Sequence, residues 1–110
     1  MKPYMFVIKS VPLPSNQHSK TIRHALVHIW VFSDNINNAQ TKACDYIKSF
    51  KWNPLSVEHA LEITEEQLSH LHKDEDLLYR KACQFGIAAD FLASPMRDKS
   101  PDGPIDYLEP

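Results

Sequence analysis

The stretch "RHALVHIWVF", residues 23–32, decides the fold. It is rich in β-branched and aromatic residues, contains no glycine or proline, and ends at the turn-forming "SDN", which is typical of a β-strand. Because successive side chains of a strand point to opposite faces, the stretch presents two surfaces. One surface holds Ala25, Val27, Ile29 and Val31, and the other holds His24, Leu26, His28, Trp30 and Phe32.

The residues on either side predict a second strand and a helix. "YMFVIKSV" (4–11) is an apolar strand, and a proline-containing loop of about a dozen residues follows it, which we expect to be a mobile flap. After residues 23–32, we expect Ser33 or Asp34 to cap a helix that stops at Asn53-Pro54. The apolar residues at helical spacing are Ile36, Ala39, Ala43, Ile47 and Phe50.

The second half of the chain predicts two further strands around a second helix. "LSVEHALEI" (55–63) alternates as a half-buried strand does. "TEEQ" (64–67) is a capping box that opens a helix, and Gly86 is its expected C-terminal cap. The charged "HKDED" (72–76) interrupts the apolar stripe, so we expect a kink or a break into two helices. A short strand, "IAADFLA" (87–93), comes last.

The expected fold class is therefore α/β (α+β), in the order β-β-α-β-α-β. Strands that flank a helix are expected to run parallel, so we predict a small mixed four-stranded sheet with both helices on one face. This is a two-layer sandwich, ferredoxin-like in general appearance. Residues 1–93 form a single α/β domain, and residues 94–110, with four prolines, form an irregular proline-rich C-terminal tail.

Composition limits the functional class. The chain has 110 residues, 43% hydrophobic residues and a net charge of −2, with an excess of basic residues in 1–57 and of acidic residues in 58–110. This split favours self-association or docking of one segment on the other. The basic residues are scattered singly, which disfavours nucleic-acid binding. The leading apolar run is too short for a signal peptide or membrane span, and Cys44 and Cys83 have no CxxC spacing, so we expect a cytoplasmic protein with reduced thiols.

His24 and His28 lie four residues apart, as the zinc ligands of a helical HExxH motif do. In a strand, however, that spacing separates them by roughly 13 Å, too far for one tetrahedral zinc ion. His70 and His72 are two apart on a predicted helix and point to different sides. The only glycines, Gly86 and Gly103, cannot build a phosphate-binding loop. We therefore expect neither a metal nor a nucleotide cofactor.

A catalytic hypothesis joins the two histidines to two carboxylates. If strands 23–32 and 55–63 are neighbours, His24 and His28 share the sheet face opposite the helices with Glu58 and Glu62. Imidazole and carboxylate in contact can transfer protons near neutral pH, so these residues are candidates for a small enzyme or ligand binder resembling dimeric α/β-barrel proteins. The same four residues equally fit a polar ladder that only keeps an open sheet soluble.

The leading functional hypothesis is a non-enzymatic module that self-associates or binds a protein partner through its open sheet face. Leu26, Trp30 and Phe32 share that face and are the expected interface residues, because an exposed aromatic patch of this kind marks an association surface. A homodimer is the simplest form, and a small-molecule ligand stays open as an alternative. A weaker hypothesis has the acidic residues 62–76 binding a larger protein partner.

Overall fold

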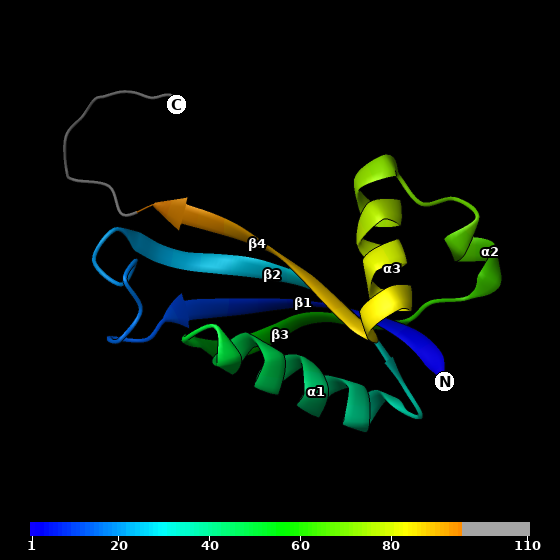
Figure 1. The fold of residues 1–110 in the computed structure, drawn as a ribbon, viewed down its shortest axis with the longest axis horizontal. Coiled ribbons are helices and arrows are strands. Elements are labelled where there is room, and N and C mark those ends of the chain that lie inside the picture. Colours follow the sequence, from blue (N-terminus) through cyan, green and yellow to red (C-terminus); the bar gives the residue numbers. More distant parts are fainter. Residues whose placement is uncertain (96–110) are drawn as a thin grey trace.

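The structure is a computed structural model that describes residues 1–95. Its elements follow one another as β1, β2, α1, β3, α2, α3 and β4, drawn in Figure 1. They span Lys2–Pro12 (β1), Ile22–Ser33 (β2), Ile36–Ser49 (α1), Trp52–Glu62 (β3), Glu65–Leu68 (α2), Lys73–Phe85 (α3) and Ile87–Pro95 (β4). β4 includes the first two residues of the proposed C-terminal tail, and the rest of that tail lies outside the described residues.

The four strands form one sheet in the order β3-β1-β2-β4, and all three pairings are antiparallel. The predicted mixed sheet is therefore wrong, and the second and third strands, whose adjacency the catalytic hypothesis required, are not neighbours. α1 does connect two strands of the same direction, β2 and β3, but the hairpin partner β1 lies between them. The hairpin pairing of β1 with β2 places β1 where the catalytic hypothesis required β3.

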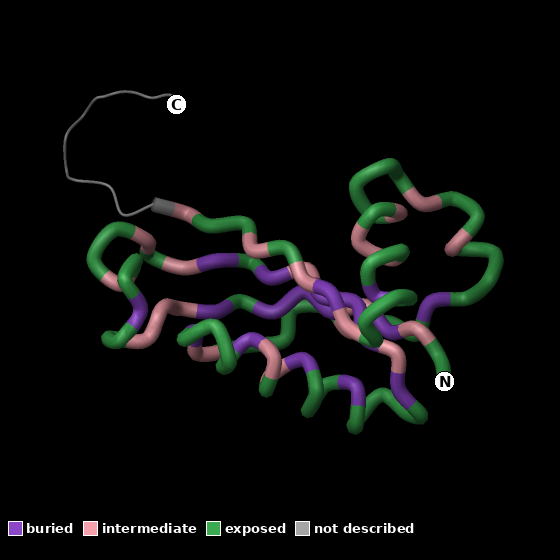
Figure 2. The backbone as a smooth tube through the Cα atoms, viewed as in Figure 1, coloured by how far each residue is buried: buried purple, intermediate pink, exposed green. Residues whose placement is uncertain are grey.

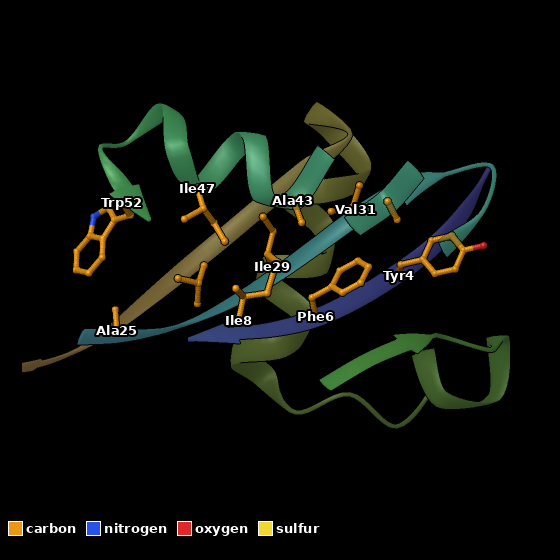
Figure 3. Packing of buried hydrophobic residues seen from close by; sticks show 11 residues of the cluster. Tyr4, Phe6, Ile8, Ala25, Ile29, Val31, Ala43, Ile47 and Trp52 are labelled. Atoms are coloured by element: carbon orange, nitrogen blue, oxygen red, sulfur yellow. The ribbon is translucent and has the colours of Figure 1, made fainter. Parts of the chain in front are cut away.

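α1 covers one face of the sheet. Its buried residues Ala39, Ala43 and Ile47 contact the small branched side chains of β2 and the apolar residues of β1. Figure 3 shows Ala43 and Ile47 pointing towards the sheet residues Ile29 and Ile8. Burying these side chains contributes about 1.5–3 kcal/mol for each large aliphatic residue. The face of β2 predicted to carry a helix therefore does so, and it forms the main core.

α3 lies on the opposite face, so the predicted arrangement with both helices on one face is wrong. Its residues Leu78, Tyr79 and Ala82 pack with Trp30 of β2 and Ala88 of β4. Trp30 and Ala88 are register partners, and Trp30 alternates along β2 with the residues under α1. The two helices thus use the two apolar faces of the same strand.

The helix ends follow from local hydrogen bonds. The predicted capping box is present: Gln67 N donates to Thr64 Oγ1 at 3.2 Å, and Thr64 N donates to Gln67 Oε1 at 2.9 Å. The expected interruption is a full break between α2 and α3. The predicted caps Ser33 and Asp34 are wrong, because Asn35 Oδ1 accepts the bond from Asn38 N at 2.8 Å and caps α1.

Gly86 ends α3 as predicted, with φ of 84°, and this left-handed geometry turns the chain directly into β4. A Cβ atom added there would meet nothing within 4 Å, so only the backbone conformation opposes a side chain. We expect Gly86→Ala to lower the free energy of unfolding by about 1 kcal/mol. Denaturant unfolding measures this. Gln84→Ala, on the exposed last turn of α3, is the control and should change stability by less than about 0.5 kcal/mol.

Candidate functional site

The proposed catalytic residues are not brought together. β1 separates the histidine strand from the carboxylate strand: Val7 pairs with His28 on one side and with His59 on the other. Side chains of β2 and β3 are therefore roughly 10 Å apart across the sheet, beyond hydrogen-bond reach. Glu62 pairs with Tyr4, which belongs to the core under α1, and it forms a 3.8 Å ion pair with Lys2. Glu62 thus lies on the face opposite His24 and His28.

Glu58 occupies an irregular position of β3. The register with β1 shifts between Val7 and Ile8, and Glu58 is the residue left without a partner. Its carboxylate accepts a hydrogen bond from Ser56 Oγ, its neighbour two residues back. The carboxylate is therefore hydrogen-bonded within its own strand, and β1 separates it from both histidines of β2. The acid–base constellation that the sequence suggested depended on a strand adjacency that does not exist.

Trp30, a proposed interface residue, is a core residue instead. Only 2% of its surface is exposed, and its ring meets Tyr79 of α3 edge to face, with centroids 5.5 Å apart. Phe32, a second proposed residue, is half-buried against the same tyrosine at 6.0 Å. The chain's own helix therefore covers the aromatic end of this face. Of the three proposed residues, Leu26 is the one that stays exposed, at 37%.

The remaining half of that face is uncovered by any described helix. α3 lies over one end of the sheet, and at the other end β2 and β4 continue beyond it (Figure 1). We call this region the open half-face; its residues are Val7, Lys9, His24, Leu26, His28, Asp90, Leu92 and Ser94. Leu26 is directly opposite Leu92, which is 49% exposed, and His28 is opposite Asp90. An exposed leucine pair, Leu26 on β2 and Leu92 on the outer strand β4, thus lies near this edge of the sheet.

β4 is an edge strand, and no described strand pairs with its outer side. Phe32 N donates to Gly86 O at 3.0 Å, which makes these residues a hydrogen-bonded pair of the β2–β4 ladder. Because such pairs alternate in an antiparallel ladder, the backbone N–H and C=O groups of Ile87, Ala89, Phe91 and Ala93 point away from β2. These groups form a free edge that can pair with another strand.

The two edges of the sheet differ. β3, the opposite edge, carries Pro54 and two register shifts against β1, devices that discourage pairing with another chain. From Ile87 to Ala93, β4 contains no proline and no lysine, and its pairing with β2 is regular. Asp90 is the single charged residue in that stretch. The β4 edge is therefore the unprotected one.

A cavity of about 510 Å³ lies on the other face of the sheet, beside α1 and β4. We call it the aromatic pocket, because Tyr46, Phe50, Trp52 and Phe91 line it. Each ring contacts the next: the centroids of Tyr46 and Phe50 are 5.0 Å apart, those of Phe50 and Phe91 5.8 Å, and those of Phe91 and Trp52 5.6 Å. Volumes of this size hold small molecules.

The polar side of the aromatic pocket is the β1–β2 loop. Asn16, 7% exposed, donates from Nδ2 to Phe50 O at 3.4 Å and to Lys51 O at 3.0 Å, and its Oδ1 accepts from His18 N at 2.8 Å. Leu13 N also donates to Lys51 O. The loop that we expected to be a mobile flap is thus hydrogen-bonded to the turn after α1. The pocket wall is preorganised by these bonds.

Sequence reasoning missed this pocket. The sequence predicts a short strand around Phe91 and gives no sign that Trp52 lies next to it. The one local signal was the pair Tyr46 and Phe50, four residues apart on the same side of α1. The other rings come from β3 and β4, so only the three-dimensional arrangement joins them.

Both cysteines are free thiols. Cys44 is half-buried, and burial raises the pKa of its thiol; Lys48 lowers that pKa and Asp45 raises it, both by smaller amounts. Cys83 is exposed on α3, where its hydrogen bond with Tyr79 is the largest cause that raises the pKa of that phenol. A thiol with a raised pKa is a poor nucleophile, so Cys44 has the character of a packing residue.

The burial of Trp30 makes a direct prediction. Trp30→Ala should lower the free energy of unfolding by about 3–5 kcal/mol, because it leaves a cavity between β2 and α3. Thermal or denaturant unfolding measures this loss. Leu26→Ala, on the open half-face, should cost less than about 1 kcal/mol. Equal costs for the two variants would contradict the assignment of Trp30 to the core.

None of the helices in residues 1–95 is long and apolar enough to cross a membrane. In comparisons with known proteins, no family model, no curated protein and no solved structure matches the chain.

Proposed function

We propose that this protein is a small non-enzymatic module that associates with a second copy of itself through β4. The observation that carries the proposal is that exposed apolar side chains and an unprotected backbone edge occur together at β4. On the open half-face, the exposed Leu26 of β2 and Leu92 of β4 lie at this edge, and on the other face the half-buried Phe91 of β4 does. Both groups flank the one unprotected edge of the sheet. The exposed Leu55, Val57 and Leu61 of β3 lie on the edge that Pro54 and two register shifts protect.

A second copy of the chain can supply hydrogen-bond partners for the free N–H and C=O groups of β4 in a closed, symmetric contact. Two β4 strands related by a two-fold axis can pair antiparallel, and each outward N–H and C=O then meets its equivalent on the other copy. The two sheets would join into one continuous sheet. Because the edge groups of each β4 are used up, the contact ends at a dimer and does not propagate.

The side chains of β4 fit one such register. With Phe91 opposite the second copy's Phe91, Ala89 lies opposite Ala93 and Asp90 lies opposite Leu92. This register places an aromatic pair at the centre of the contact, which is a favourable cross-strand combination. It also keeps the two Asp90 carboxylates from lying directly opposite one another, which avoids the repulsion of like charges.

The alternative function, a small enzyme or ligand binder that uses His24, His28, Glu58 and Glu62, receives less support. β1 separates the two pairs, and Glu62 is on the opposite face. We infer a reducing compartment such as the cytoplasm, which two free thiols support. One feature supports a ferredoxin-like relationship: β2, α1 and β3 form a split β-α-β unit, with β1 between the two parallel strands. The position of α3 on the face opposite α1 is not ferredoxin-like.

The proposal predicts that the purified chain has twice the mass of one chain in solution, and that Ala89→Pro makes it a monomer. The Ala89 N–H points to the free edge, so proline there removes a donor to the second copy and leaves the β2–β4 ladder intact. Light scattering after gel filtration gives the mass, and circular dichroism shows whether the fold persists. The two-fold axis repeats the Ala89 contact in each copy, so the substitution removes two backbone hydrogen bonds from the dimer. We therefore expect the dimer dissociation constant to rise at least about tenfold.

Two further variants keep the test decisive. Leu92→Glu places a second carboxylate beside Asp90 of the other copy and should also give a monomer without touching the backbone. Leu55→Glu is the matched control, since Leu55 is a 55% exposed leucine of the opposite edge strand β3 and should leave the mass unchanged. A monomeric wild-type chain at every concentration, or a dimer that survives both β4 variants, contradicts the proposal.

A further inference from the structure

We propose that the aromatic pocket binds a small planar aromatic carboxylate. The proposal concerns the face of the sheet that carries α1 and does not depend on the association through β4. It rests on three observations: the chain of aromatic rings, the charge of the residues around them, and the backbone conformation of Lys51.

The rings select a planar apolar ligand. Phe50 contacts Tyr46 and Phe91 edge to face, with interplanar angles of 76° and 72°, respectively. Phe50, in the middle, is 49% exposed although it lines a cavity of about 510 Å³. An aromatic guest would cover that ring and extend the same edge-to-face or offset contacts, which favours a flat ring system over an aliphatic chain.

The charge of the lining selects an anion. No aspartate or glutamate lines the pocket. The basic residues that line it are Lys51, in the turn after α1, and His18, in the β1–β2 loop. A cationic ligand would meet the Lys51 ammonium with no carboxylate to offset the repulsion. A single ammonium is a point charge suited to one carboxylate, whereas recognition of a phosphate group usually uses several donors or a guanidinium.

The backbone of Lys51 provides the independent observation. Its φ is 65°, the left-handed conformation that glycine usually takes directly after a helix. The peptide groups around it are fixed, because Lys51 N donates to Lys48 O at 2.9 Å and Lys51 O accepts from Leu13 N and Asn16 Nδ2, both at 3.0 Å. A lysine with a fixed backbone thus lines the pocket at a position where glycine would be unstrained, and we infer that its side chain is there to meet a ligand.

The two tryptophans allow a direct test, because Trp52 lines the pocket and Trp30 lies under α3 on the other face. The full chain, labelled with 5-fluorotryptophan, is titrated with 2-naphthoate while the two fluorine resonances are followed by NMR. We expect a saturable shift of the Trp52 resonance and none of the Trp30 resonance. The uncharged 2-naphthamide should bind about fivefold more weakly, the factor that a partly exposed ion pair supplies, and the cationic 2-naphthylmethylammonium more weakly still.

Lys51→Gly separates binding from structure. It removes the ammonium and at the same time relieves the left-handed strain, so the chain should be as stable as the wild type or more stable. In this variant 2-naphthoate and 2-naphthamide should bind equally. Lys73→Met, which removes an exposed lysine at the start of α3, should keep the wild-type preference for the carboxylate.

Three results would overturn the proposal. The first is no shift of the Trp52 resonance, or equal shifts of both tryptophans, since either means that the pocket does not hold the ring. The second is a preference for 2-naphthylmethylammonium over 2-naphthoate. The third is a carboxylate preference that survives Lys51→Gly, because the charge that selects the anion would then lie elsewhere.

Discussion

The structure depends on the alternation of side chains along β2. Both faces of this strand are apolar over part of their length: Val27 and Ile29 lie under α1, and Trp30 lies under α3. A single strand therefore anchors two helices on opposite sides of the sheet. Because α3 lies over one end of the sheet, it leaves the other end of its face uncovered (Figure 2). Everything that we propose about association follows from this incomplete cover.

The placement of α3 also explains the second uncovered region. α1 packs chiefly on β1, β2 and β3, and the outer strand β4 has no described helix above it on that side. The aromatic pocket occupies this space, between the flank of α1 and the residues Ala89 and Phe91. The edge strand thus borders an apolar surface on each face. The proposed dimer contact and the proposed ligand site are neighbours on β4: the contact uses its backbone edge, and the Phe91 side chain belongs to both.

The sequence predicted the local elements well and their assembly poorly. The apolar alternation of residues 23–32, the capping box at Thr64 and the turn at Gly86 depend on neighbours in the chain, and the structure confirms them. Strand order depends on which strands pair with one another, and this is not encoded in any one stretch of sequence. Here β1 pairs with β2 as a hairpin and lies between β2 and β3. Alternation showed two apolar faces on β2 without assigning a helix to each. The rings of the aromatic pocket, from Tyr46 to Phe91, are joined by the fold alone.

The central claim is that the edge of β4 is paired in solution. Amide hydrogen exchange, followed residue by residue by NMR, tests it most directly. The N–H groups of Ala88 and Asp90 bond to β2, whereas those of Ala89 and Phe91 point to the free edge. If two copies pair, all four amides are protected, and protection of Ala89 and Phe91 falls as the protein is diluted. Fast exchange of Ala89 and Phe91 at every concentration, beside protected Ala88 and Asp90, would contradict the account.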